Sequence, residues 1–302
     1  LLRTLERNTN NIQIYNNEGE TKMTLTLTRQ KENLENYIRS KGYSTTGMNL
    51  LGNQVILEKP IIDSYEEVNR PKELVDLVNT IETLTEGGEY EVNNFSSEVL
   101  EEVNLERSEL PNIDKKTIKV NYSVRSFSGY LTFSQEQIDD GQYNLSDYLG
   151  RKIVKLERRT RNKEIGKILQ TAEKKTVTDI DELKSIISLI SPERKVSIAM
   201  TQSLFDILSK IKDTTGNYLL KTDKVAGTTE TFYVDNFLIV DDTTLGSKGD
   251  KLAFVGDLEN FVTLFDRKKS TLSWSSSGKN FGKRLVLRTR FDAKKSRQTV
   301  VT

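Results

Sequence analysis

The stretch that decides the fold is residues 127–169, FSGYLTFSQEQIDDGQYNLSDYLGRKIVKLERRTRNKEIGKIL. It reads as an apolar strand, a capped turn and then a long helix crowded with arginine and lysine. Just before it, Ile118, Val120, Tyr122 and Val124 alternate with polar residues, which is the period-two pattern of a strand with one buried face. The sequence therefore predicts a strand region that leads into helix.

Two helix starts follow this strand region. Ser134 at N-cap and Gln137 at N3 favour a short helix that ends at Gly141. A second start lies at Asn144, and no proline interrupts the chain from Ser146 to about Ala172. The apolar residues of this second segment keep near-helical spacing: Leu149, Ile153, Leu156, Ile165 and Ile168. Of these, Leu149, Ile153 and Leu156 are expected to mark the packed face of the helix. We expect one helix of roughly seven turns, at 3.6 residues per turn.

Composition limits the class of protein. With 302 residues, 35% hydrophobic and 29% charged, the chain can bury a core in one or two domains. No apolar run approaches the roughly 20 residues of a membrane span, and the amino end lacks signal-peptide order, so we expect a soluble, intracellular protein without a membrane partner. The absence of Cys excludes disulfides, and the absence of His removes the commonest general base and metal ligand.

Charge is distributed unevenly although the net charge is only +1. Residues 61–115 hold 15 acidic and 4 basic residues, whereas residues 151–174 hold 9 basic and 3 acidic, and residues 266–302 hold 11 basic and 2 acidic. Such asymmetry is compatible with nucleic-acid contact, with one copy's acidic part lying on another copy's basic part, or with solvated faces.

Turn signals organise the first half of the chain. Residues 1–45 read as an extended arm with little core of its own, although Leu34, Tyr37 and Ile38 lie on a helix that ends at Gly42. Pro60 suits a first helical position, and Pro71 ends that helix. Next, Thr80 to Leu84, a Gly87-Gly88 turn and the pair Tyr90 and Val92 predict a hairpin. Residues 93–116 are acidic and read as a long excursion flanked by strands.

The second half has a mixed α and β pattern. Asp179 and Glu182 form a capping-box pair before one helix, and Thr201 can cap another. Strands are expected at Val196 to Met200, Phe237 to Val240 and Leu252 to Val255. The segment from Ser270 to Phe291 again predicts strands, which would pair back with the first domain and make it discontinuous.

Catalytic interpretations find little support. Asp139-Asp140 and Asp241-Asp242 are candidate metal carboxylates, but adjacent residues on a strand point to opposite faces, and both pairs lie beside turn residues. Gly87-Gly88 lacks the phosphate-binding loop pattern, and Ser275-Ser276-Ser277 has no histidine to activate a nucleophile. We predict no catalytic, cofactor or metal site, and no enzyme.

The order of these elements resembles one family. It is carried by Tyr130-Leu131-Thr132-Phe133-Ser134 with Ile138-Asp139-Asp140, the long helix, Leu208-Ser209-Lys210-Ile211-Lys212-Asp213 with Gly216-Asn217-Tyr218-Leu219, and Phe254-Val255-Gly256-Asp257. Over about residues 30–295 this is similar to the major capsid proteins of tailed bacteriophages, the Hong Kong 97-type fold. No single motif is diagnostic, and the signal lies in order and spacing.

The resemblance implies an α+β fold with four parts. They are an amino-terminal arm at 1–59, a peripheral domain with a long spine helix at 60–85, 117–175 and 266–302, an extended loop at 86–116, and a mixed α/β axial domain at 176–265. It implies a structural protein of the virion capsid, assembled in the host cytoplasm into an icosahedral shell of hexamers and pentamers around phage double-stranded DNA. Portal, scaffolding or protease components would be further partners.

Two groups of residues are the candidate contacts in such a shell. On the extended loop they are acidic: Glu98, Glu101, Glu102, Glu106 and Glu109. On the spine helix they are basic and would face either a neighbouring subunit or DNA: Arg151, Lys155, Arg158, Arg159 and Lys163. Two other functions stay open, namely an encapsulin-like cellular compartment shell of the same fold and a basic nucleic-acid-binding protein.

Overall fold

The computed structural model describes residues 27–57, 59–66, 70–94, 116–132, 145–190, 194–212, 215–218, 220, 222–223, 228–229, 232–267, 270–276 and 283–296. The chain divides into two compact units: unit 1 takes residues 1–68, 126–158 and 268–290, and unit 2 takes residues 69–125, 159–267 and 291–302. Helix α5 (Leu145–Leu169) and strand β14 (Lys283–Lys295) contribute residues to both. The arm, peripheral and axial boundaries expected from the sequence stay a prediction.

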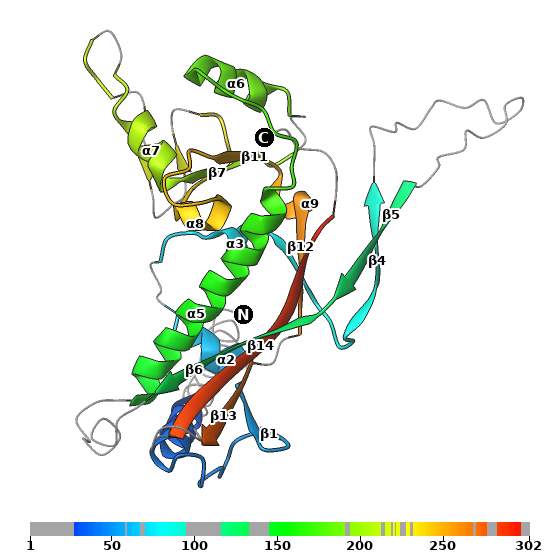
Figure 1. Cartoon of the computed structure of the whole chain (residues 1–302), viewed down its shortest axis with the longest axis vertical. Coiled ribbons are helices and arrows are strands. Elements are labelled where there is room, and N and C mark those ends of the chain that lie inside the picture. Colours follow the sequence, from blue (N-terminus) through cyan, green and yellow to red (C-terminus); the bar gives the residue numbers. More distant parts are fainter. Residues whose placement is uncertain are drawn as a thin grey trace, which may run out of the picture. The chain divides into compact units, whose positions relative to one another are not determined.

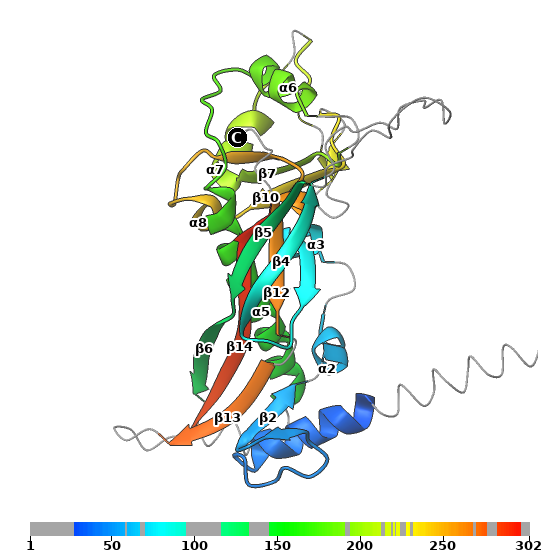
Figure 2. The ribbon, with the colours of Figure 1, turned by 90° about the vertical axis from the view of Figure 1, so that its right-hand side faces the viewer.

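Unit 1 is built on an antiparallel sheet. Strands β1 (Leu50–Leu51), β2 (Gln54–Leu57), β13 (Ser270–Ser276) and β14 are neighbours in that order, and β6 (Arg125–Thr132) pairs with β14. Figure 2 shows β2 lying beside β13. One apolar core joins this sheet to the helices of the unit: Leu34, Tyr37, Ile38, Val55, Leu57, Ile61, Tyr65, Leu145, Leu149, Ile153, Val154, Leu272, Leu285 and Leu287.

This core corrects the expectation that the arm has little core of its own. Residues 27–39 are helical, as expected, and Leu34, Tyr37 and Ile38 are at most 2% exposed. The expectation is wrong for the described residues 27–45, because three apolar side chains on one face of the helix pack into the core of the subunit beside Val55 and Leu57 of β2. Gly42 has a φ of 85°, and its N–H donates to Tyr37 O, which supports the predicted helix end.

Unit 2 contains a second strand arrangement and a separate hairpin. Strand β12 (Val262–Asp266) pairs antiparallel with β14 and parallel with β3 (Asn79–Glu82). Strand β4 (Gly87–Asn94) pairs antiparallel with β5 (Lys116–Ser123) over eight residues. The predicted hairpin between Thr80 to Leu84 and Tyr90 to Val92 is therefore wrong: β3 pairs with β12, and Gly87 and Gly88 begin β4 rather than forming a turn. The nearby glycine pair suggested a turn, but the strand partner of Ile81 is Phe265, which lies far along the chain.

The remainder of unit 2 is a mixed layer around a three-stranded sheet of order β10-β7-β11, with β10 parallel and β11 antiparallel to β7. Its strands are β7 (Ser197–Thr201), β10 (Asn236–Val240) and β11 (Ala253–Gly256), and its longer helices are α6 (Ile180–Ser188) and α7 (Gln202–Ser209). Asp179 and Thr201 are the N-caps of α6 and α7, as predicted. Figure 1 shows both helices beside β7 and β11.

The shorter elements complete the two units. In unit 1, α2 spans Lys59–Asp63, with Pro60 as its second residue. In unit 2 they are α3 (Leu74–Leu77), α8 (Asp242–Leu245), α9 (Leu258–Phe261) and the two-residue strands β8 (Thr222–Asp223) and β9 (Thr228–Thr229). The predicted short helix after Ser134 and the pair Asp139-Asp140 lie outside the described residues.

Helix α5 confirms the predicted long helix and ends three residues before the expected Ala172. Leu149 and Ile153 are at most 2% exposed, but Leu156 is 40% exposed, so its predicted place on the packed face is wrong. The inward position there belongs to the next residue, Glu157, whose carboxylate accepts a hydrogen bond from Ser270. None of the helices in the described part of the chain combines the length and apolar character that a membrane span needs.

Candidate subunit-contact surfaces

Helix α5 carries two kinds of basic residue. The first kind is used within the subunit: Arg158 donates to Glu66 at 3.4 Å, Arg161 donates to Asp266 at 3.1 Å, and Lys167 donates to Glu164. Arg158 was among the predicted contact residues, but its side chain is only 11% exposed and serves this internal pair. Arg158 and Arg161 thus hold the helix to other parts of its own chain, whereas Lys167 pairs within the helix.

The second kind forms an exposed line, here called the α5 stripe, of Arg151, Lys155, Arg159 and Lys163. The four residues are spaced four apart, so they follow one another along one side of the helix, and all are exposed. None forms an ion pair with a carboxylate among the residues that the structure describes. The structure thus brings together four of the five predicted basic residues on one side of α5; their role as contacts stays a prediction.

Arg159 of the stripe acts electrostatically on Asp241. Hydrogen bonds from the Thr243 side chain and backbone lower the pKa of Asp241, and the charge of Arg159 adds a smaller lowering. Asp241 is also the N-cap of α8, while Asp242 accepts hydrogen bonds from Ser203. These two carboxylates therefore serve capping and loop bonding, and no group of residues in the described segments has the composition of a metal site.

The β4–β5 hairpin is held at its base by an ionic cluster whose two carboxylates are buried. Arg125, which directly follows Val124 after the hairpin, donates to Glu164 at 2.9 Å and lies 3.4 Å from the Asp292 carboxylate. The two carboxylate side chains are 7% and 1% exposed. Burial raises the pKa of Glu164, but hydrogen bonds and charge from Lys167 and Arg125 outweigh it and hold that pKa below its usual value.

Aromatic rings seat the hairpin on β12. The Tyr122 ring stacks on Phe265, with 4.3 Å between ring centroids, and Tyr90 meets the same ring edge-on at 5.7 Å. The Tyr122 hydroxyl shares hydrogen bonds with the Thr83 and Thr85 hydroxyls at 3.1 and 2.8 Å, and these bonds lower its pKa. The base of the hairpin is thus firmly attached to unit 2.

Most of the hairpin beyond this seat is exposed. Glu89, Glu91 and Lys119 project from the ribbon and pair across it, with the Lys119 ammonium 3.3 Å from Glu89 and 3.8 Å from Glu91. Figure 1 shows β4 and β5 standing apart from β12 over most of their length. A two-stranded ribbon is only marginally stable by itself in water. The five predicted loop glutamates, Glu98, Glu101, Glu102, Glu106 and Glu109, lie outside the described residues.

Sequence reasoning missed the cluster of Arg125, Glu164 and Asp292. Arg125 follows a regular alternation and reads as a solvent-facing residue, and Glu164 sits among cations on a long helix. Asp292 lies between Phe291 and Ala293, and all three are buried. An acidic residue inside a strand gives no sign that both faces of that strand are covered, so no pattern in the sequence could have identified this cluster.

Comparison with known proteins now decides the family. The model of the phage capsid family matches residues 53–293, which is most of the chain. The chain belongs to the phage capsid family. A search of curated proteins found no match.

Solved structures show the same fold at low sequence identity. The capsid of a native GTA particle is 12% identical over 76% of this chain and 87% of its own, with a TM-score of 0.56. The capsid of an empty GTA particle gives 12% identity, 76% and 88% coverage and the same TM-score of 0.56. A structure of Microbacterium phage Oxtober96 gives 11% identity, 76% and 87% coverage and a TM-score of 0.50.

The predicted fold class and family are therefore confirmed. The chain is a structural major capsid protein of the Hong Kong 97-type fold, and copies of it assemble into a multimeric shell of the virion. The alternative of a cellular compartment shell is not better supported by these comparisons.

Proposed function

We propose that this protein forms a closed icosahedral shell around double-stranded DNA, with its β4–β5 hairpin and α5 stripe as the contacts between copies. The observation that carries the proposal is a pair of surfaces left incomplete in one subunit. The stripe has four exposed cations without a carboxylate partner among the described residues, and the hairpin exposes most of its ribbon. A neighbouring copy completes both.

The acidic loop of one copy pairs with basic residues of the next. Residues 95–115, between β4 and β5, contain Glu98, Glu101, Glu102, Glu106, Glu109 and Asp114 against Arg107 and Lys115. Each exposed ion pair contributes only about 0 to 1 kcal/mol, so the effect depends on many pairs repeated around the shell. The α5 stripe is the partner surface, because its four cations form no ion pair with the described residues of their own subunit.

DNA is the second candidate for the α5 stripe. Contacts of that kind would go to phosphate and would be indifferent to base sequence. The two partners predict different orientations: DNA-facing cations point into the shell, whereas assembly contacts lie within about 4 Å of a neighbour's carboxylate, as surface ion pairs do. A reconstruction of an assembled particle separates them by where these four side chains point.

Other partners of the proposal follow from the family resemblance. They are a portal and scaffolding or protease components, with assembly in the host cytoplasm. The protein works as structure rather than as an enzyme, and it needs no cofactor.

The test removes the loop's charge. A variant with Glu98, Glu101, Glu102, Glu106 and Glu109 changed to Gln should assemble slowly or not at all, measured by light scattering and electron microscopy, while circular dichroism stays unchanged. The matched control removes exposed negative charge elsewhere in unit 2, with Asp181→Asn, Asp206→Asn and Glu259→Gln, and should assemble normally. Normal assembly of the loop variant would rule out the charge-pairing contact, and a wild-type chain that stays monomeric across concentration and salt would rule out the shell.

A further inference from the structure

We propose that the cavity between α6 and α7 binds one long-chain carboxylate, the anion of a fatty acid. The cavity has a volume of about 940 Å³ and is bordered by α6, α7, β11 and residues 174–179. It lies entirely within unit 2, so a single chain contains the whole site. Small-molecule sites in proteins commonly have volumes of roughly 300–1,000 Å³, mostly apolar walls and a few polar groups that orient the ligand.

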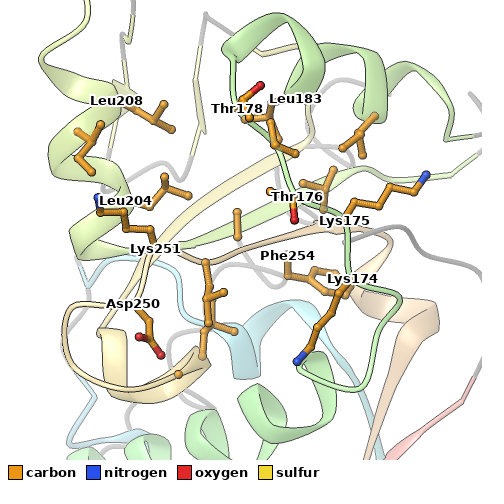
Figure 3. Close-up of a pocket in the computed structure, with 18 of the residues that line it drawn as sticks. Lys174, Lys175, Thr176, Thr178, Leu183, Leu204, Leu208, Asp250, Lys251 and Phe254 are labelled. Atoms are coloured by element: carbon orange, nitrogen blue, oxygen red, sulfur yellow. The ribbon is translucent and has the colours of Figure 1, made fainter.

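The walls of the cavity are apolar and partly open to solvent. Helix α7 contributes Leu204, Ile207 and Leu208, whose spacing places them on one face of the helix. Figure 3 shows Leu204 and Leu208 reaching the cavity from α7, Leu183 from α6 and Phe254 from β11. No residue of α7 is fully buried, and Ile207 is 40% exposed. An apolar ligand that covered this face would remove it from water, which is favourable.

The rim of the cavity is basic. Lys174, Lys175 and Lys251 line it, and none of them forms an ion pair with a residue in the described segments. Figure 3 shows Lys251 on the α7 side of the cavity and the other two lysines on the opposite side. The lining also holds Asp179 and Asp250, but each of these carboxylates accepts a backbone N–H bond, at 2.6 and 2.7 Å. Three lysines against two engaged aspartates favour an anionic ligand.

Apolar walls and an ammonium rim together select a ligand that is both apolar and anionic. An acyl chain suits the walls, because each methylene group that leaves water stabilises the complex. Its carboxylate stays at the rim, where a lysine ammonium can donate to it while remaining in contact with water. A polyanion without an apolar part would leave the walls exposed, and an uncharged lipid would leave the lysines without a counter-charge. A fatty acid anion satisfies both parts of the site.

Binding is tested on the full chain, kept dilute so that it stays unassembled, with a dansyl-labelled undecanoate as the fluorescent probe. We expect saturable binding of the probe and its displacement by oleate. In a series of unlabelled carboxylates from octanoate to palmitate, used below their micelle concentrations, affinity should rise by up to roughly fourfold for each added methylene group until the cavity is filled. The alcohols of the same chain lengths should bind more weakly, and that difference should shrink at high salt, because salt screens exposed charges.

Charge variants test the role of the rim. The rim variant changes its three lysines together: Lys174→Gln, Lys175→Gln and Lys251→Gln. It should bind the probe roughly threefold to tenfold more weakly than wild type, as expected when weak exposed pairs are lost. The matched control removes the same charge from three lysines of unit 2 that do not line the cavity: Lys184→Gln, Lys195→Gln and Lys210→Gln. The control should bind the probe like wild type.

Thiol labelling locates the acyl chain independently of affinity, because the chain has no cysteine of its own. Ile207→Cys, at the border of the cavity, should react with a maleimide more slowly when oleate is present. The matched control is Asp206→Cys, the preceding residue of α7, which lines a different cavity and should react at the same rate with and without oleate. Leu252 is 42% exposed and also lines the cavity, so Leu252→Cys provides a second position if Ile207→Cys fails to fold by circular dichroism.

Four results would overturn the inference. The first is no saturable probe binding by folded wild-type chain. The second is binding that the rim variant does not weaken, or that protects neither Ile207→Cys nor Leu252→Cys. The third is labelling of Ile207→Cys that slows with chain concentration but not with oleate, which would show that a second copy covers the cavity. The fourth is flotation with phosphatidylglycerol vesicles without binding to free carboxylates, which would make the ligand a membrane surface.

These measurements do not depend on the shell proposed above, because they use unassembled chains. Electron microscopy of the wild-type chain at higher concentration decides the shell function separately. The cavity can therefore fail as a carboxylate site in a chain that assembles normally, and it can bind carboxylate in a chain that forms no particles.

Discussion

Replacing Arg125 with methionine removes the cation that holds the base of the β4–β5 hairpin while it keeps much of the side chain's length. Arg125 pairs with Glu164 at 2.9 Å and with Asp292 at 3.4 Å, and both carboxylates are nearly buried. Arg125 itself is 53% exposed, so solvent screens part of the interaction. Lys167 and Lys294 remain beside the two carboxylates after the change. We therefore expect a loss of about 1 to 2 kcal/mol in the free energy of unfolding at neutral pH, below the cost of an uncompensated buried charge.

This loss should depend on pH with a defined sign. The pKa of Glu164 in the folded chain lies below its usual value of 4.5, so its ionised form stabilises the fold above that pH. That contribution disappears as pH falls through the lowered pKa. The difference between wild type and Arg125→Met should therefore be largest above about pH 5 and shrink in acid, as the carboxyl becomes protonated in both proteins.

The assay is urea unfolding of chains kept dilute enough to stay unassembled, since association would make apparent stability depend on concentration. The control is Arg267→Met, which breaks a pair with Glu86, a side chain that is 73% exposed. Such an exposed pair should contribute less than about 1 kcal/mol at any pH. Equal losses in the two variants, or a loss from Arg125→Met that does not change with pH, would refute the role given to the cluster.

Two further changes test the packing of unit 2. Tyr122→Phe should lower the free energy of unfolding by about 1 kcal/mol, because it removes the hydrogen bonds to Thr83 and Thr85 but keeps the ring stack on Phe265. Tyr122→Ala also removes the stack and should lower it more. If the two variants are equally unstable, the stack contributes little. Gly166→Ala should lower the melting temperature strongly, because the added Cβ would lie 2.0 Å from Thr244 O. The control is Gly129→Ala, which has no atom within 4 Å of the added Cβ and should melt near the wild-type temperature. Similar melting temperatures for both variants would contradict the close approach of α5 to Thr244.

Local signals in the sequence predicted most elements of the fold. Asp179 and Thr201 were identified as N-caps because a short polar side chain before an apolar run has one common structural use. The helix at 145–169 was predicted from uninterrupted spacing, and the strands at 236–240 and 253–256 from short apolar runs. Each of these features depends on residues within a few positions of one another.

Features that depend on distant residues could not be predicted in the same way. Strand β3 pairs with β12 across more than 180 positions, and nothing near Thr80 marks that partner, so the nearby Gly87-Gly88 suggested a turn instead. Glu157 is buried and Leu156 is exposed, because the hydroxyl of Ser270, far along the chain, donates a hydrogen bond to the Glu157 carboxylate. Periodicity reports which residues share a face, but the fold decides which face is covered.

The sequence also does not show which basic residues of α5 pair within the subunit and which are left for contacts with other copies. Within α5, Arg158, Arg161 and the α5 stripe look alike in sequence, yet Arg158 and Arg161 form ion pairs within the subunit, and the four stripe residues form none with the residues that the structure describes. A cation whose partner lies in the same chain stabilises the subunit at any concentration, whereas one whose partner lies in another copy stabilises only the assembly. Substituting the stripe should therefore leave the unfolding of dilute chains nearly unchanged while it weakens association, and substituting Arg158 or Arg161 should do the reverse. On the proposal above, this division, rather than the number of charges, would make the helix both a structural element of the subunit and a contact of the shell.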